Sequence, residues 1–233
     1  MTAFLTKSDI ISLKPGFPVI SIAGAGGKTT LMFDLAKNFP DPAVMTTTTK
    51  VGADQIAAAD LCLELSRFPP PEMHSSIWVS PSLAPQNGKI CGCSPEEFSR
   101  LAFLCREAHL PLINEADGAA RRHIKAPAQN EPVIPKESDI CIYVVGLDVL
   151  GKPVNGETVH RPEIFSSLTG SSEGDIIDTD SIIRLLEHPA GGLKNIPEHA
   201  VKIAYLTHVN SRERLQAAEF ITSKIKSYDY VSL

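Results

Sequence analysis

The sequence predicts an α/β protein in which helices cover both faces of a mainly parallel sheet. Short runs rich in β-branched residues alternate with segments of helical periodicity along the 233 residues, as is typical of βαβ crossovers. The first such run is followed at once by glycines and a lysine, and later runs by hydroxyls or acids. Ligands on parallel sheets collect at the carboxyl ends of the strands. We therefore expect a ligand site where these polar residues follow the strands.

Strands are predicted where a short apolar run ends in turn or polar residues. They cover residues 17–23, 41–49, 75–80, 110–117, 138–148, 201–210 and 228–233. Helices are predicted where apolar residues recur every three or four positions or where a start signal occurs, such as Ser94 followed by Pro95 and two glutamates. They cover residues 28–39, 94–109, 178–189 and 211–227. We interpret 1–233 as a single domain, with an insertion or mobile segment near 146–175, because that connection is long.

Composition and charge exclude several classes of protein. The net charge of −5 argues against a nucleic-acid partner, and no apolar run approaches the roughly 20 residues that span a bilayer. The first residues lack the continuous apolar core of a secretory signal. The five cysteines are scattered, and Cys91 and Cys93 are spaced too closely for a zinc knuckle. These features predict a cytoplasmic protein without disulfides.

A glycine-rich turn follows the first predicted strand and reads GAGGKTT. Glycines let backbone N–H groups turn toward a ligand, and the following helix start adds partial positive charge. Lys28 would reach the β- and γ-phosphates, and the hydroxyl of Thr29 would ligate Mg²⁺. The alternative is an ordinary strand-to-helix turn with a surface lysine. The residues expected to bind the nucleotide phosphates are Gly24, Ala25, Gly26, Gly27, Lys28, Thr29 and Thr30.

The turn departs from the full phosphate-loop pattern at Ile22, where that pattern has glycine. The shorter form resembles the loop of the Mur ligases and other compact ATP-binding folds. The sequence therefore favours a P-loop NTPase-like variant of the α/β class.

The second predicted strand ends in four threonines and Lys50. A hydroxyl there would complete a Mg²⁺ shell or orient a transferred group, and we expect a role for Thr48, Thr49 or Lys50. Of these, Lys50 is the expected catalytic residue and Thr49 the expected substrate contact. Threonine is also a good strand former, so this run requires no function.

Glu115 and Asp117 follow the fourth predicted strand. Alternation along an extended chain places both carboxylates on one face, where they would hold Mg²⁺ together with Thr29. We also expect both to act in catalysis, with Lys28. The alternative is a pair of solvated acids at a strand end.

Cationic side chains after this strand offer a site for an anionic second substrate. A solvated basic turn explains them nearly as well. The expected substrate contacts are Arg121, Arg122, Lys125, His160 and Arg161. His123 is a further cationic group after this strand, and Asp148 and Lys152 are further candidates for substrate contacts after the next strand.

The segment LTHVN, at 206–210, stands where a GTPase of this architecture carries its guanine-recognition motif. Thr207, His208 and Asn210 do not match that motif, and an amide lacks the charged acceptor that guanine requires. ATP is therefore favoured over GTP as the nucleotide, with Mg²⁺.

In their order along the chain, the segments GAGGKTT, TTTTK, EADGA, KAPAQNEPVIP, VVGLDVLGKP and VHRPE resemble those of the YqeC family. Proteins of this type are described as accessory proteins for selenium-dependent molybdenum hydroxylases. The resemblance is strong over about residues 18–163 and weaker over the rest. It implies a nucleotide-binding protein that takes part in the maturation of a molybdenum hydroxylase cofactor.

Two functions are compatible with these features. The first is an ATP-dependent enzyme that transfers a phosphoryl group or ligates a small second substrate through an acyl phosphate. The second is a nucleotide-gated chaperone or cofactor carrier for a molybdenum hydroxylase, in which slow hydrolysis controls release of a partner. An inert fold that retains the loop is disfavoured by the intact Lys28 and Thr29.

Overall fold

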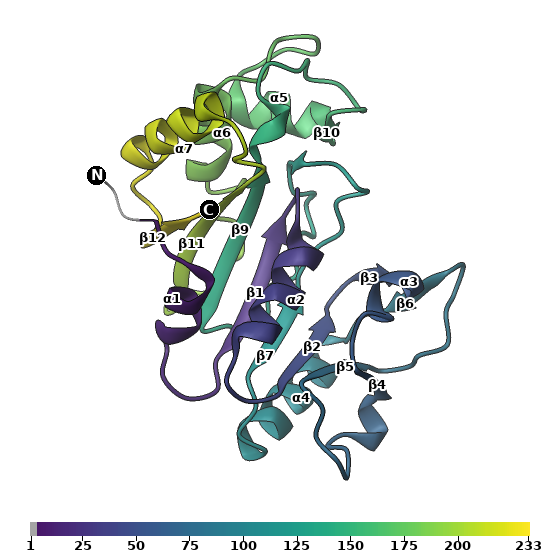
Figure 1. The fold of residues 1–233 in the computed structure, drawn as a ribbon. Helices are drawn as coiled ribbons and strands as arrows, with labels where there is room; N and C mark the ends of the chain where they lie inside the picture. The colour runs from purple at the N-terminus through teal and green to yellow at the C-terminus, as the bar shows by residue number, and fades with distance from the viewer. Residues whose placement is uncertain (1–3) are drawn as a thin grey trace.

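The predicted α/β class is confirmed by a computed structural model that describes residues 4–233 (Figure 1). Residues 1–3, part of the predicted domain range, lie outside the described residues. Eight parallel strands form one sheet in the order β12-β11-β9-β1-β7-β2-β5-β4. Their bounds are β1 Val19–Gly24, β2 Ala43–Thr47, β4 Leu61–Glu64, β5 Ser76–Ser80, β7 Leu112–Glu115, β9 Ile140–Gly146, β11 Val201–Thr207 and β12 Tyr230–Ser232.

The central strand β1 is buried on both faces, which explains its continuous apolar run. On one face, Ile20 and Ile22 pack against α1 (Lys7–Ser12) and α2 (Lys28–Asn38). On the other face, Val19 and Ala23 contribute to the clusters beneath the remaining long helices. These helices are α4 Pro95–Glu107, α5 Pro162–Thr169, α6 Thr179–Glu187 and α7 Arg212–Lys224. The predicted covering of both faces is therefore observed, as Figure 1 shows.

Each predicted strand and helix has a counterpart, with bounds that the structure shortens at one or both ends. The predicted strand over 41–49 ends at Thr47, because the chain bends at Thr48 before it forms β3 (Lys50–Gly52). Two small ribbons were not predicted. In one, β3 pairs with β6 (Lys89–Cys91), and in the other β8 (Ile124–Lys125) pairs with β10 (Val159–His160). Strands of two or three residues are too short to show a periodicity.

Several further elements were likewise not predicted. They are α1, α3 (Ala53–Ile56), β4, α5 and the 3₁₀ turns η1 (Leu65–Arg67) and η2 (Leu147–Val149). Among the described residues, no helix has the length and apolar character needed to cross a membrane.

The long connection after β9 runs along the protein rather than away from it. Val154 and Phe165 are buried in the core cluster beneath α6 and α7. Backbone hydrogen bonds join Val154 to Asp175 (2.8 Å) and Ile177 to Lys152 (2.9 Å). The connection thus doubles back on itself, and its start at η2 lies at the carboxyl end of β9 beside the tip of β1.

Candidate functional site

The glycine turn between β1 and α2 has a backbone conformation that favours glycine at three positions. The φ angles are +90° at Gly24, +93° at Gly26 and +128° at Gly27. A Cβ atom on Gly24 would overlap the carbonyl of Val144 and lie 2.8 Å from its nitrogen, and one on Gly26 would lie 2.7 Å from the nitrogen of Gly146. The turn is therefore wound tightly against β9, and residues with side chains would not fit it.

The amides of this turn fall into two groups. The N–H of Gly24 donates to Asp117 Oδ2 (3.1 Å), and that of Ala25 donates to the carbonyl of Val144 (2.8 Å). Within residues 4–233, the amides of residues 26–30 find no backbone carbonyl acceptor. They lie at the N-terminus of α2, where amides point toward an anion and the helix dipole favours it.

Lys28 is the first residue of α2, and its side chain is bent back over the turn. Its Nζ donates to the carbonyl of Gly24 (2.8 Å) and lies 3.2 Å from Asp117 Oδ1 and 3.7 Å from Glu115 Oε1. The side chain is 4% exposed. Two carboxylates and a carbonyl therefore keep this buried ammonium group paired.

Glu115 ends β7 beside Thr29. The hydroxyl of Thr29 donates to Glu115 Oε2 (3.1 Å), and Gln55 Nε2 lies 3.4 Å from the same hydroxyl. Burial raises the pKa of the Glu115 carboxyl and nearby Asp117 adds to the effect, while Lys28 and Thr29 oppose it. A hydroxyl and a carboxylate in contact are the hard oxygen donors that Mg²⁺ prefers. The pair fits the expected metal site.

Asp117 has a different setting from Glu115, although the sequence grouped the two. It is fully buried, and its Oδ2 lies 2.9 Å from Nζ of Lys125, which is also buried. Asp117 therefore lies between the ammonium groups of Lys28 and Lys125, whereas the hydroxyl of Thr29 contacts Glu115. Of the two carboxylates, Glu115 is better placed for the predicted metal role, because it contacts the Thr29 hydroxyl.

The ion pairs that join Lys28, Asp117 and Lys125 continue beyond Lys125 to Glu131 and Arg161, and this series of five residues is called the charged chain. Lys125 Nζ lies 2.6 Å from Glu131 Oε2, and both carboxylate oxygens of Glu131 accept hydrogen bonds from Arg161 at 2.8 Å. Burial disfavours the Glu131 anion, but the hydrogen bonds from Arg161 and Lys125 outweigh it and lower its pKa to about 2. Burial and the neighbouring Arg161 and Lys125 lower the pKa of His160. An alternating series of charges thus links the glycine turn to β10.

A pocket of about 570 Å³ opens at the turn. It is lined by residues 26–30, by Glu115, by Lys50, Gly52, Asp54, Gln55 and Lys89 around the β3–β6 ribbon, and by residues 118–123. The structure therefore brings together the predicted Gly26, Gly27, Lys28, Thr29, Thr30, Glu115, Lys50, Arg121 and Arg122. The predicted residues that do not line it are Gly24, Ala25, Thr49, Asp117, Lys125, His160 and Arg161. Of these, Asp117, Lys125 and Arg161 belong to the charged chain.

The threonine run is largely occupied by backbone contacts. The hydroxyls of Thr46, Thr47 and Thr48 donate to the carbonyls of Val79, Glu115 and Val133 at 2.7–2.8 Å. Thr49 contacts Thr47 through its hydroxyl (3.3 Å). These bonds tie β2 to its neighbours, which leaves Lys50 as the residue of this run that reaches the pocket.

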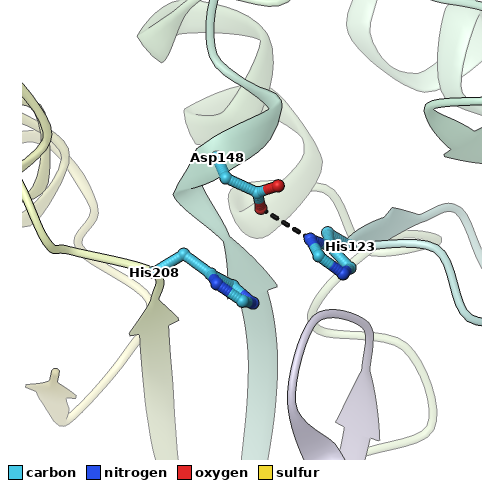
Figure 2. Close-up of side chains that lie close together, drawn as sticks. All are labelled: His123, Asp148 and His208. Carbon is cyan, nitrogen blue, oxygen red and sulfur yellow. Dashed lines mark hydrogen bonds and ion pairs between the residues drawn. The ribbon is translucent and has the colours of Figure 1, made fainter.

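Three residues form a cluster that the sequence did not group. His123, Asp148 and His208 come from the segment after β7, from η2 and from the residue after β11 (Figure 2). Sequence reasoning considered each separately, as a cation, a substrate contact and a mismatch to a base-recognition motif. The available signal was their common position at or shortly after the carboxyl ends of predicted strands, since parallel strands end at the same edge of the sheet.

The profile of the family described as "YqeC protein" matches residues 20–163. "Uncharacterized protein YqeC" of Escherichia coli (strain K12) is 30% identical over 216 residues, which cover 91% of this chain and 84% of that protein. No solved structure matches the chain. The matched residues include the glycine turn, Glu115 and both ends of the charged chain.

Proposed function

The chain belongs to the YqeC family, and from the geometry of its glycine turn we propose that it binds ATP with Mg²⁺. The observation that carries this proposal is the run of amides over residues 26–30 that find no backbone acceptor in the described part of the chain, with Lys28 and the Thr29–Glu115 pair lining the same pocket. Amides, an ammonium group and oxygen donors for a divalent cation are together what a polyphosphate requires.

Each group has a distinct role in this proposal. The amides of residues 26–30 hold phosphate oxygens, and Lys28 exchanges its carboxylate partners for the β- and γ-phosphates. Thr29 and Glu115 hold Mg²⁺, which neutralises charge on the phosphates. Lys50, Arg121 and Arg122, at the outer part of the pocket, face a second, anionic substrate. The activity proposed is a Mg²⁺-dependent phosphoryl transfer, ligation or hydrolysis, in which positioning and charge stabilisation dominate.

A nucleotide-gated chaperone or carrier is the second candidate, and the charged chain favours it. Phosphates that draw Lys28 away from Asp117 change the balance of charges around Lys125 and Glu131, and hence the contact with Arg161. Such a shift would transmit nucleotide occupancy to β10 and the connection around it. Under either candidate, the motifs shared with the YqeC family support a role in the maturation of selenium-dependent molybdenum hydroxylases.

The first experiment is nucleotide binding by calorimetry and thermal shift, with and without Mg²⁺. Lys28→Ala is compared with Lys37→Ala, an exposed lysine in the last turn of the same helix. We expect Mg²⁺-ATP to stabilise the wild type by about 2.7 kcal/mol at 100 times its Kd. Lys28→Ala should lose affinity about 10- to 100-fold, as for a charged hydrogen bond, and Lys37→Ala should not. Thr29→Val provides a second variant if Lys28→Ala folds poorly. Unchanged ATP affinity in both site variants would overturn the proposal.

The two candidates are separated by what stimulates ATP hydrolysis. Stimulation by a small anionic acceptor, with formation of a phosphorylated or ligated product, supports the enzyme. Stimulation by an apo molybdenum hydroxylase, without modification of a small molecule, supports the chaperone.

A further inference from the structure

His123, Asp148 and His208 bring two imidazoles and a carboxylate to one point beside the glycine turn. One potential ligand atom from each residue lies within 4.8 Å of the others. Figure 2 shows Asp148 pointing toward His123, with the ring of His208 alongside. The three come from separate segments of the chain, so the tertiary fold creates the cluster.

The contacts within the cluster leave one histidine without an ionic partner. His123 Nδ1 lies 2.7 Å from Asp148 Oδ1, and an ion pair would explain these two residues. The ring of His208 stacks on that of His123, with centroids 4.5 Å apart and planes at 9°. Neutral imidazole is the form that binds a metal. The ion pair alone therefore does not account for His208.

Gly146 restricts the positions of two of the three residues, His123 and Asp148. The N–H of Gly146 donates to the carbonyl of His123 (2.8 Å). A Cβ atom on Gly146 would lie 2.9 Å from Cβ of His123 and 3.0 Å from Oδ1 of Asp148. The space that both side chains occupy thus depends on the absence of a side chain at position 146.

Asp148 and the backbone of His208 each accept a hydrogen bond from a cationic side chain outside the cluster. Lys152 donates to Asp148 Oδ2 (3.2 Å), so Oδ1 is the oxygen directed into the cluster. His208 has a left-handed backbone (φ +58°), and Arg214 donates to its carbonyl (3.2 Å). The contact from Lys152 to the second oxygen of Asp148 is of the kind that orients the ligands of metal sites.

We propose that His123, Asp148 and His208 bind one divalent transition-metal ion of the Zn²⁺ or Fe²⁺ class. A donor set of two imidazoles and one carboxylate suits these ions and disfavours Mg²⁺. Ligand bonds of about 2.0–2.2 Å separate ligand atoms by about 3.3 Å in a tetrahedral site, a value between the 2.7 Å contact and the 4.8 Å limit of the cluster. Closing the site therefore requires the ligand atoms to move from their present separations toward this value.

Three protein ligands leave at least one coordination position for water or another ligand. His123 also lines the pocket at the glycine turn, so a metal here would lie next to the proposed nucleotide phosphates. The metal site does not rest on nucleotide binding, because its ligands are distinct from Thr29 and Glu115.

The test uses tag-free, reduced, chelator-treated full-length protein, titrated with Zn²⁺ alone and with Mg²⁺ alone in the absence of nucleotide. The variants are His208→Ala and Asp148→Asn, and the matched controls are His74→Ala, an exposed histidine remote in sequence, and Cys91→Ser, a half-buried thiol. Calorimetry gives stoichiometry and affinity, and the absorption of the Co²⁺-loaded protein reports nitrogen and oxygen ligands. Thermal unfolding of the metal-free variants reports whether each is folded.

We expect one Zn²⁺ per chain, no comparable Mg²⁺ binding and a loss of Zn²⁺ affinity in both site variants. The loss should exceed the roughly 10- to 100-fold typical of outer contacts, and both controls should retain wild-type affinity. Failure of the wild type to bind Zn²⁺, retention of binding by a folded His208→Ala, or a thiolate signature with Co²⁺ would overturn the proposal. Weaker ATP binding by His208→Ala without any Zn²⁺ binding would also overturn it, and would assign the stacked rings to the nucleotide base.

Discussion

The ammonium group of Lys28 lies 3.2 Å from Oδ1 of Asp117, beneath the turn to which Lys28 itself belongs. Asp117 also accepts the N–H of Gly24, so one buried carboxylate holds both the first residue of the turn and the lysine that follows it. Asp117 thereby stabilises the conformation of the turn. This position yields a stability prediction that does not depend on any ligand.

Asp117→Asn should destabilise the protein by about 3–5 kcal/mol, as measured by urea unfolding. The substitution keeps the size of the side chain but leaves Lys28 and Lys125 buried with one fewer counter-charge, and a broken buried pair costs about this amount. Asp54→Asn is the control, because its carboxylate is 74% exposed and 3.9 Å from Arg121, and it should change stability by less than about 0.5 kcal/mol. Equal stability of the two variants would contradict the supporting role.

Glu115→Gln should separate Mg²⁺ binding from folding. Because the pKa of Glu115 is raised in the folded state, the folded protein binds more protons than the unfolded chain above pH 4.5. This carboxylate therefore lowers stability as the pH rises through that window, and the glutamine variant should be no less stable than the wild type at neutral pH. Mg²⁺ should no longer strengthen ATP binding in the variant, with a loss of about 10- to 100-fold by calorimetry. A full Mg²⁺ effect in Glu115→Gln would move the metal elsewhere.

The order of the long strands and helices could be predicted because each carries its own pattern, such as the buried run of β1 or the cap at Ser94. The position of the glycine turn followed from the same patterns. The roles of Lys125 and Asp117 could not be predicted, because nothing local distinguishes a buried lysine from one that faces a pocket. The ammonium group of Lys125 pairs with Asp117 and Glu131, and Tyr143 of β9 donates a hydrogen bond to the backbone carbonyl of Lys125.

The histidine cluster shows the same limit for a site. His123 and His208 are 85 positions apart in the sequence, and neither has a neighbouring ligand at a spacing that indicates a metal. Their proximity follows from the side-by-side order of β7, β1, β9 and β11, which aligns the ends of these strands, and from the hydrogen bond that the N–H of Gly146, at the end of β9, donates to the carbonyl of His123. Sequence reasoning could predict that strand ends meet, but not which side chains would face each other there.

Gly24→Ala should destabilise the protein even though it adds one methyl group. The φ of +90° is strained for alanine, which alone costs about 1–3 kcal/mol, and the new Cβ would overlap the backbone of Val144. Gly118→Ala is the matched control at the same edge of the pocket, since nothing lies within 4 Å of its Cβ position. Unfolding by urea should place Gly118→Ala close to the wild type. A similarly small effect of Gly24→Ala would mean that the turn is not wound against β9 as described.

The contact between Glu131 and its two cations should make stability depend on pH in a defined acid range. The folded-state pKa of about 2 is below the usual value of 4.5, so the unfolded chain binds the proton first as the pH falls. The stabilisation is complete above about pH 4.5 and is lost progressively toward pH 2. Glu131→Gln should lower stability at neutral pH by about 1.5–3 kcal/mol, the range for hydrogen bonds to charged groups, and should flatten the decline below pH 4.5. Urea unfolding at several values in this range measures both effects. Glu163→Gln, on the exposed start of α5, is the control, and its stability should follow the wild-type pH profile. A pH profile of Glu131→Gln that runs parallel to that of the wild type would place the acid sensitivity in other carboxylates.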